Sequence, residues 1–432
     1  MNQPLKACII GAGSSGIVAA KVFTEHHIPF DCFEKGSQVG GLWKYNNDNG
    51  LSAAYRSLHI NTSKRITAYS DFPMPEDYPD YPSHEQMARY FDAYVDHFGI
   101  REKITFNTEV VRVQPAENGQ WQVHLSTGEQ RSYDAVVVAN GHHWHPRMAS
   151  FPGDFSGEQL HSHHYRTPEP FAGKRVLIIG IGNSAVDIAV DLCQIAQTVF
   201  VSTRRSAHIL PKFVLGRPID YFTTPFMTRL PLSLQRLGFH LLLWMARGPQ
   251  KAYGIPLPRH KLLQEHPTIS SDFLVRVRHG DIFIKPNVAE LKGDRIRFLD
   301  GTEERIDVII HATGYNIRFP FFEPDFFEVK DNDLRLYCRV VHPEFPTLFF
   351  LGFVQPLGPI MPLAELQAKW IASILSGNCT LPDKQTMLRE IERYRKSIAK
   401  RYVESPRHTL EVDFYPYIRQ LKKEMKRRKR SH

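Results

Sequence analysis

The sequence predicts an α/β protein with two dinucleotide-binding Rossmann-like domains, one inserted in the other. The first observation is a repeated unit of strand, glycine turn, helix and strand, which occurs at 5–35 and again at 174–205. Such a unit buries its apolar strands in a parallel sheet covered by helices. The second observation is that the chain after residue 315 resumes with strand-like and helical patterns. We interpret these as the return of the first domain.

The elements of the first domain follow in order. "ACII" reads as a buried strand, the next apolar positions as a helix packed on a sheet, and "PFDCFEK" as the parallel neighbour. Residues 85–98 have the helical period. Residues 104–128 alternate and turn at Glu117-Asn118-Gly119, which predicts an antiparallel ribbon. "YDAVVVANG" at 133–141 is another buried strand.

The second domain starts again after Pro152 with the unit at 174–205. Prolines and apolar pieces interrupt it at 206–280, a stretch that we expect to shape access to the site. The alternating stretch 281–315 then closes the domain. "PTLFFLGFVQPLGP" at 346–359 and a helix beginning at Glu365 belong to the first domain again. We therefore predict domains at 1–147, 148–309 and 310–432, the last completing the first.

Composition narrows the class of protein. A chain of 432 residues is long enough for two or three domains. Its five cysteines form no Cys-x-x-Cys pair and no zinc-like cluster, so we expect a reducing compartment, no metal and no dithiol chemistry. No signal peptide is visible, because the first residues run directly into a strand, and the most apolar later stretch is too short to span a bilayer. We expect a cytoplasmic protein.

The net charge of +9 is concentrated at the C-terminus. Residues 416–432 hold eight Lys or Arg and one Glu, so the rest of the chain is close to neutral. This argues against a specific nucleic-acid surface. The run predicts a solvated or disordered basic tail, with weak contact to anionic lipid or RNA as the alternative.

The first glycine turn has the full dinucleotide spacing, with Gly11, Gly13 and Gly16. The glycines allow a tight turn, close approach of a pyrophosphate and close packing of helix on strand. The helix N-terminus offers N–H groups to the phosphates. Glu34 follows at the distance where a carboxylate binds two ribose hydroxyls, which suits FAD or NAD.

The second glycine turn predicts a different ligand. Gly180, Gly182, Asn183 and Ser184 form the turn, and Ala185 replaces the third glycine. Thr203 stands at the position that corresponds to Glu34, and Arg204 and Arg205 come next. Two guanidiniums there suit the 2′-phosphate of NADP. The alternative is a pair of surface arginines. Two units for two dinucleotides indicate FAD as resident electron carrier and NADPH as hydride donor.

A central motif carries a resemblance to a known family. "FSGEQLHSHHY" contains Phe155, Gly157, His161 and Tyr165 in a spacing that resembles the identifying sequence of the flavin-containing monooxygenases. "FEKGSQVGGLW", "INTSK", "YSDFPMPEDYPDYP", "HATGY" and "GFVQPLGP" also resemble this family. The related Baeyer–Villiger monooxygenases typically end the motif in Trp-Pro or Trp-Asp. In this chain Tyr165 and Arg166 stand at those two positions, which favours the first group and leaves ketone oxidation open.

The resemblance implies an activity. NADPH reduces FAD, O2 adds to the reduced flavin to give a flavin hydroperoxide, and an amine nitrogen or sulfide sulfur of a small molecule takes one oxygen atom. Baeyer–Villiger oxidation of ketones is the alternative within this class. A flavin reductase or dehydrogenase without oxygen insertion is a second hypothesis, and a non-catalytic NADPH sensor is a third. A homodimer and a weak membrane contact of the basic tail stay open as partners.

The same resemblance implies site residues. Asn61 matches a position whose amide lies near the oxygenated flavin; the alternative is a turn residue before Thr62. Trp43 could line the flavin site or belong to the core, and we expect Tyr165 or another aromatic residue near it on the nicotinamide side. For His161 we favour a structural role through backbone hydrogen bonds. The remaining candidate FAD contacts are Ser15, Lys35, Gly41, Leu42, Thr62 and Gln355.

Overall fold

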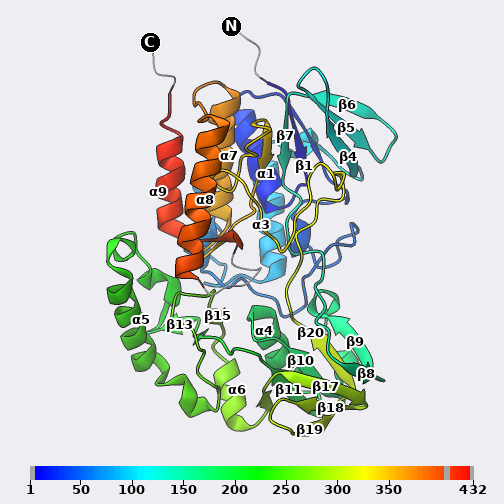
Figure 1. Cartoon of the computed structure of the whole chain (residues 1–432), viewed down its shortest axis with the longest axis vertical. Helices are drawn as coiled ribbons and strands as arrows, with labels where there is room; N and C mark the ends of the chain where they lie inside the picture. Colours follow the sequence, from blue (N-terminus) through cyan, green and yellow to red (C-terminus); the bar gives the residue numbers. More distant parts are fainter. Residues whose placement is uncertain (1–4, 403–408, 429–432) are drawn as a thin grey trace. The chain divides into compact units, whose positions relative to one another are not determined.

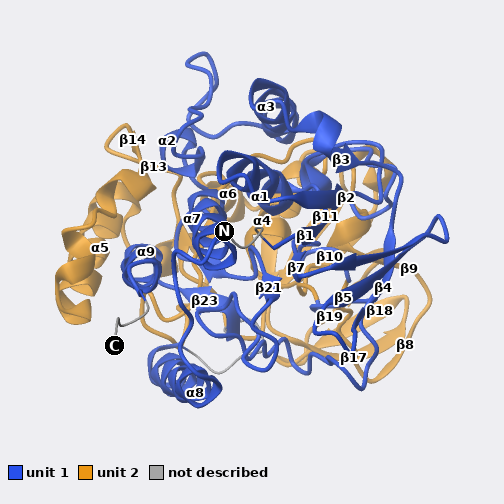
Figure 2. Cartoon of the chain, turned by 90° about the horizontal axis from the view of Figure 1, so that it is seen from above, with its two compact units in different colours: residues 1–52, 62–145, 316–432 blue, residues 53–61, 146–315 orange. Residues whose placement is uncertain are grey.

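The computed structural model describes residues 5–402 and 409–428 (Figure 1). The chain forms two compact units (Figure 2). Unit 1 consists of 1–52, 62–145 and 316–432, and unit 2 of 53–61 and 146–315. The long second stretch of unit 2 is thus inserted between parts of unit 1. The predicted boundaries at 147 and 309, and the cofactor assigned to each domain, stay predictions.

Unit 1 is built on a five-stranded sheet in which every neighbouring pair is parallel. Its central strands are buried on both faces, which explains why "ACII" and "AVVV" lack polar residues. The third stretch of unit 1 adds the edge strand, so residues more than 200 positions apart share one sheet. In spatial order the strands are β21 (Leu348–Phe350), β7 (Ala135–Val138), β1 (Ala7–Ile10), β2 (Phe30–Phe33) and β3 (Ile104–Thr105).

Helices pack on this sheet. α1 (Ser14–Glu25) contacts α7 (Met361–Leu375) and α3 (His84–His97). α3 starts with a capping box in which Ser83 and Gln86 exchange hydrogen bonds, which confirms the predicted helix near 85–98. The predicted ribbon is also confirmed: β4 (Val110–Pro115) pairs antiparallel with β5 (Trp121–Leu125), and β6 (Gln130–Tyr133) adds a third strand.

The basic C-terminal run differs from its prediction. Residues 414–424 form α9 (Phe414–Glu424), whose Tyr417 and Leu421 are buried. The Tyr417 hydroxyl donates to the Cys338 carbonyl at 2.7 Å and accepts from the Gln367 amide at 2.8 Å. The expectation of a solvated tail is therefore wrong for this part, because its lysines occupy one face of a helix whose other face packs. Residues 429–432 lie outside the described residues.

Unit 2 contains two larger sheets besides two small two-stranded ones. The first is five-stranded and parallel, again with both faces covered by apolar side chains. In spatial order its strands are β16 (Ile282–Lys285), β11 (Thr198–Ser202), β10 (Arg175–Ile179), β20 (Val308–His311) and β9 (Glu158–His161). The second sheet consists of β19 (Glu303–Arg305), β18 (Arg295–Phe298), β17 (Val288–Gly293) and β8 (Gly153–Phe155). The helix of the second repeated unit is α4 (Asn183–Leu192).

The stretch 206–280 has a small apolar core of its own, which includes Leu210, Leu243 and Leu262. It contains α5 (Leu232–Arg247) and α6 (Phe273–His279). Its short strands are β12 (Ile209–Leu210), β13 (Phe213–Val214), β14 (Arg217–Pro218) and β15 (Thr268–Ile269). Over 5–402 and 409–428, no helix has the length and apolar character needed to cross a bilayer.

Candidate functional site

The first glycine turn joins β1 to α1 and is closed by backbone contacts. Gly11 has φ of +98°, and a Cβ there would lie 2.9 Å from the Ala139 carbonyl oxygen. A Cβ on Gly16 would lie 1.8 Å from the Gly11 carbonyl oxygen. Neither position can hold a side chain in this backbone. The roles predicted for the first and third glycines, a tight turn and close packing of the helix, agree with this geometry.

Gly13 is different, because the protein leaves room in front of it. Its nearest neighbour across the turn is the Cα of Gly41, 3.9 Å from where a Cβ would be, and no other atom lies within 4 Å. Gly13 is the N-cap of α1, with no side-chain cap and no acid in the first turn. An open space before an uncapped helix N-terminus fits the pyrophosphate of a dinucleotide.

The segment after Glu34 closes over this turn. The short helix η1 (Gly41–Trp43) follows Gly40, whose N–H donates to the Ala12 carbonyl at 3.0 Å. Gly41 has φ of +54°, and a Cβ there would lie 3.3 Å from the Gly13 Cα. Leu42 and Trp43 are half-buried beside it. Gly40 and Gly41 therefore lie against the first glycine turn.

Glu34 is buried at the carboxyl end of β2, and its carboxylate binds the turn itself. Oε2 accepts the Ala12 N–H at 2.8 Å, and Oε1 accepts the Gly36 N–H at 2.9 Å. The Asn49 amide also donates to Oε1, at 3.3 Å. Each oxygen can accept more than one hydrogen bond, so the carboxylate is oriented and can still accept ribose hydroxyls. A carboxylate that can still accept hydrogen bonds fits the hydroxyls of an unphosphorylated adenosine ribose.

Other candidate FAD residues are spread along unit 1. Ser15 lies against Gly352, so the segment after β21 reaches the start of α1. Gln355 begins β22 (Gln355–Pro356), which pairs with β23 (Glu411–Val412). Thr62 lies just before α2 (Lys64–Thr67), and its hydroxyl shares a hydrogen bond of 2.8 Å with the hydroxyl of Thr67, the last residue of that helix. Lys35 is exposed and forms an ion pair with Glu109 at 3.2 Å.

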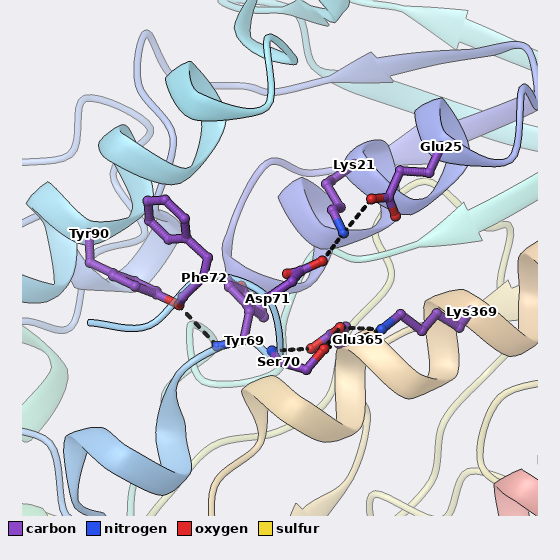
Figure 3. Close-up of polar contacts among 9 residues, drawn as sticks. All are labelled: Lys21, Glu25, Tyr69, Ser70, Asp71, Phe72, Tyr90, Glu365 and Lys369. Atoms are coloured by element: carbon purple, nitrogen blue, oxygen red, sulfur yellow. Dashed lines mark hydrogen bonds and ion pairs between the residues drawn. The ribbon is translucent and has the colours of Figure 1, made fainter. Parts of the chain in front are cut away.

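The segment Tyr69–Phe72, which we call the strap, holds α1 in place (Figure 3). It begins the stretch "YSDFPMPEDYPDYP", for which the sequence predicted no structural role. The Tyr69 hydroxyl donates to the carbonyl oxygen of Ser14, the first residue of α1, at 2.5 Å. The Tyr69 N–H donates to the Tyr90 hydroxyl at 3.0 Å, and that hydroxyl donates to the Phe72 carbonyl at 2.5 Å. One side chain of α3 thus bonds both ends of the strap.

The middle of the strap binds α7 and α1 through charges (Figure 3). The buried Glu365 accepts the Ser70 N–H at 2.7 Å and also bonds the Ser70 hydroxyl and Lys369. Asp71 pairs with Lys21 of α1, which is buried. Burial lowers the pKa of Lys21, but hydrogen bonds to Asp71 and Glu25 outweigh it and raise the pKa above its usual value. In the sequence, only the position of Lys21 among the apolar residues of the predicted helix indicated that an acidic partner such as Asp71 would be needed.

Asn61 retains an unused polar atom. Its Oδ1 is buried and has no hydrogen-bond partner among the described residues. Buried amides in proteins are usually satisfied, and an orphaned one needs an explanation such as an absent ligand. Asn61 groups with unit 2 by its contacts, and Thr62 with unit 1. The amide oxygen of Asn61 can therefore accept a hydrogen bond from a ligand.

The second glycine turn repeats the geometry of the first in unit 2. Gly180 has φ of +119°, and a Cβ there would lie 2.5 Å from the Ala312 carbonyl oxygen. Its N–H donates to the Ser202 carbonyl at 2.9 Å. α4 begins after Gly182 with no side-chain cap and no acid in its first turn, so it too can receive a phosphate. Ser184 is half-buried in that first turn.

The stretch 206–280 is fastened to this turn. Asn183 Oδ1 accepts the Ile269 N–H at 2.8 Å, and the Thr268 hydroxyl donates to the Ile181 carbonyl at 2.7 Å. β15 therefore braces the loop at which NADP is predicted to bind. The side-chain oxygen of Asn183 already has this partner, so a contact with NADP would fall to its amide nitrogen or its backbone.

Arg204 and Arg205 are exposed and follow the carboxyl end of β11. Because β10 and β11 are parallel, with Ile179 opposite Ser202, both arginines lie at the edge where the glycine turn begins. In unit 1, Ile10 is opposite Phe33 and Glu34 follows. Thr203 is therefore the counterpart of Glu34, and the two arginines follow it at the same edge of the sheet in unit 2.

The central motif has a structural role at His161, as predicted. Nδ1 accepts the His163 N–H at 3.0 Å, so Nε2 carries the proton and donates to the Gly314 carbonyl at 3.0 Å. Burial lowers the pKa of His161 to about 4, which keeps the ring neutral. The prediction for Tyr165 is wrong. Its ring is buried in the core of unit 2 and its hydroxyl donates to Asp191 at 2.6 Å, so it cannot pack on a nicotinamide.

Comparison with known proteins agrees with this geometry. The family described as Flavin-binding monooxygenase-like matches residues 5–430. Flavin-containing monooxygenase 5 of Homo sapiens is 39% identical over 437 residues, which cover 96% of this chain and 82% of that protein. Dimethylaniline monooxygenase [N-oxide-forming] 2 of Mus musculus is 37% identical over 440 residues, with the same coverage of 96% and 82%.

Solved structures share the fold. S-allyl-L-cysteine S-oxygenase from Allium sativum is 28% identical, with a TM-score of 0.75 over 98% of this chain and 89% of that one. A cyclohexanone-bound cyclohexanone monooxygenase has a TM-score of 0.72 at 18% identity, covering 97% of each chain, and shows the fold alone. The predicted class of enzyme, a flavin-dependent monooxygenase with FAD and NADPH as cofactors, is confirmed. With glycine turns in both units and a family match along nearly its whole length, the chain belongs to the Flavin-binding monooxygenase-like family.

Proposed function

We propose that this enzyme uses NADPH and O2 to oxygenate a soft nucleophile, an amine nitrogen or a sulfide sulfur of a small molecule. One oxygen atom enters the substrate and the other leaves as water, while NADPH and a proton supply the two electrons and the hydrogens. FAD, when bound, supplies the redox chemistry and activates dioxygen. The observation that carries the proposal is the pair of uncapped glycine turns, one followed by Glu34 and the other by Arg204 and Arg205.

We assign roles to the chain's residues accordingly. Glu34 orients the FAD ribose, while the N–H groups at the start of α1 hold the pyrophosphate. The Gly182 turn and the two arginines hold NADP. Asn61 donates a hydrogen bond at the reacting oxygen through its side-chain NH2 group. Its buried Oδ1, which has no partner among the described residues, can accept a hydrogen bond from a ligand. Trp43, Leu42 and Gln355 line the flavin.

The test is product formation by the purified holoenzyme under 18O2, with NADPH and a panel of a tertiary amine, a thioether and a cyclic ketone. We expect 18O in an N-oxide or sulfoxide, with one NADPH consumed for each product molecule. An 18O-labelled ester or lactone from the ketone alone would replace the proposal by Baeyer–Villiger oxidation. NADPH oxidation that reduces an added acceptor and labels no substrate would indicate a reductase.

A cytoplasmic location, a homodimer and a weak contact of the basic C-terminal run with anionic membranes remain predictions. Each needs a measurement on the full chain in solution. Sedimentation velocity would decide the oligomeric state.

A further inference from the structure

A short segment of the N-terminal part of the chain belongs to unit 2. Residues 53–61 group with unit 2, whereas 1–52 before them and 62–145 after them group with unit 1. Asn61, to which we assign a role in oxygen transfer, is the last residue of this segment. The segment contains no helix and no strand. Its position, and with it that of Asn61, therefore depends on side-chain contacts and single hydrogen bonds.

Tyr55 anchors the 53–61 segment. Its ring is 4% exposed and lies in the apolar core of unit 2, and its hydroxyl donates to Oδ2 of Asp187 on α4 at 2.8 Å. Leu58 packs on the same core, and its N–H donates to the Tyr55 carbonyl at 2.9 Å. The Arg56 N–H donates to the Arg166 carbonyl, also at 2.9 Å. The Tyr55 hydroxyl thus ties the segment to α4.

Asp187 lies one turn after the start of α4, the end of the helix at which the NADP pyrophosphate is predicted to bind. Burial raises the pKa of Asp187 to about 6, against the hydrogen bond from Tyr55 and the charges of Lys212 and His59, which lower it. Burial also raises the pKa of Tyr55, so the phenol keeps its proton. At neutral pH the bond between them is therefore charge-assisted, which makes it stronger than a bond between neutral groups.

We propose that Tyr55 and Asp187 are positioning residues for oxygen transfer, whose hydrogen bond fixes the segment that ends in Asn61 on the helix predicted to bind NADP. The proposal rests on the role of Asn61 in the proposed function. A donor that stabilises a reacting oxygen must be held in place before the reaction, by groups that need not touch the substrate. Tyr55 is six residues from Asn61 and supplies such a fixed point.

α4 also carries a second pair of the same kind, which serves as a matched control. The Tyr165 hydroxyl donates to Asp191 at 2.6 Å, and Asp191 lies one turn after Asp187. The rings of Tyr55 and Tyr165 are in edge contact in one core, with centroids 5.9 Å apart. Tyr165, however, is not part of the 53–61 segment. Loss of either hydroxyl removes a bond from the core to α4, but only the Tyr55 hydroxyl holds the segment of Asn61.

The first test is hydrogen exchange of the FAD-loaded enzyme without nucleotide, read by mass spectrometry on peptides that cover 53–61. We expect Tyr55→Phe and Asp187→Asn to speed exchange there by about tenfold, because each removes or weakens a charge-assisted hydrogen bond. The double variant should add little to either single one, since both changes act on the same bond. Tyr165→Phe should exchange like the parent over 53–61.

The second test is the ratio of product and hydrogen peroxide to NADPH consumed, with a tertiary amine or thioether that the parent oxygenates. In Tyr55→Phe we expect the peroxide share to rise several-fold. The rate of anaerobic flavin reduction by NADPH should change little, because hydride transfer does not use Asn61. Tyr165→Phe should stay coupled. FAD content equal to that of the parent shows that each variant is folded.

The outcomes separate the possible failures. Parental exchange over 53–61 in both single variants would overturn the proposal, and so would faster exchange with parental coupling, because Asn61 would then be held by other contacts. Uncoupling of Tyr165→Phe as strong as that of Tyr55→Phe would assign the effect to core packing. Full coupling in Asn61→Ala would refute the role of Asn61 itself, whereas an uncoupled Asn61→Ala beside a coupled Tyr55→Phe would refute only the positioning role.

Discussion

Tyr69 and Tyr94 show how much depends on the partner of a single hydroxyl. Both rings are buried in one aromatic cluster, with centroids 4.5 Å apart. The Tyr69 hydroxyl bonds the first residue of α1, whereas the Tyr94 hydroxyl has no partner in the described part of the chain. Burial raises the pKa of both phenols, so both stay neutral donors. The difference between them is that the Tyr69 hydroxyl has an acceptor, the Ser14 carbonyl, and the Tyr94 hydroxyl has none among the described residues.

Replacing Tyr69 by Phe should weaken FAD binding, because it frees the N-terminus of α1 that holds the pyrophosphate. A lost hydrogen bond of about 1 kcal/mol corresponds to an increase in the FAD dissociation constant of about fivefold. Tyr94→Phe is the control, since it removes a hydroxyl of the same kind without a lost bond. Fluorescence titration of the apoprotein with FAD measures both. Equal effects of the two variants would show that the cluster serves packing alone.

Asn61 is the residue on which oxygen transfer should depend most. Removing one preorganised donor costs about 3 to 4 kcal/mol in the state that it stabilises. Asn61→Asp and Asn61→Ala should keep FAD and should still oxidise NADPH. Product should fall steeply, and hydrogen peroxide should appear in its place. The measurement is the ratio of product and peroxide to NADPH consumed. Full coupling in both variants would remove Asn61 from the mechanism.

At the scale of elements, we expect the carboxyl ends of β2 and β11 to select the dinucleotide. Each strand is the parallel neighbour of the strand that leads into a glycine turn. The first residues after β2 and β11 are therefore predicted to reach the ribose of the dinucleotide at the adjacent turn. A carboxylate stands there in one unit and two arginines in the other.

Replacing Arg204 and Arg205 by Ala should raise the apparent dissociation constant for NADPH and leave the apparent dissociation constant for NADH nearly unchanged. Each charge-assisted contact is worth about 1.5 to 3 kcal/mol before coupling between the two. The measurement is flavin reduction under anaerobic conditions over a range of each nucleotide. If the preference for NADPH survives the double substitution, the 2′-phosphate is bound elsewhere.

α9 is an element whose removal should destabilise the fold. Ending the chain after Pro416 deletes the buried Tyr417 and Leu421, and the loss of one such leucine side chain typically costs about 2 to 5 kcal/mol. We expect a large fall in melting temperature and in bound FAD. Two controls isolate packing from charge: ending the chain after Arg428, and Lys422→Glu/Lys423→Glu. Near-parental stability of the Pro416 truncation would show that α9 contributes no core.

At the scale of the whole molecule, we expect each of the two similar units to bind one dinucleotide, FAD in unit 1 and NADP+ in unit 2. A ligand that binds one unit stabilises that unit and slows its local opening. FAD should therefore slow amide hydrogen exchange at the β1–α1 turn and η1, and NADP+ should slow it at the β10–α4 turn. Mass-spectrometric hydrogen exchange with each ligand separately measures this. Protection of the β10–α4 turn by FAD alone would reverse the assignment of the domains.

The sequence by itself determined the two strand–turn–helix–strand units, the insertion of one in the other, and the places of Glu34, Arg204 and Arg205. These follow from local rules, because glycine spacing, buried strands and parallel pairing bring residues within about 25 positions to one sheet edge. The clash at Gly16 and the open space at Gly13 both agree with those rules. The role of His161 could also be anticipated, because a buried histidine is usually satisfied by backbone partners.

Tertiary structure alone decided the rest. The strap is held by a hydrogen bond between Ser70 and Glu365, which are 295 positions apart, and no local sequence pattern predicts such a contact. Tyr165 occupies a position of the family motif, but its ring packs in the core of unit 2 and its hydroxyl bonds Asp191, which the motif itself does not reveal. In the C-terminal run the charge count concealed Tyr417 and Leu421, two residues that a helix directs into the core. A charge count adds up the residues on all faces of a helix, whereas folding buries only one face. Which face is buried depends on residues that are distant in the sequence and pack against the helix.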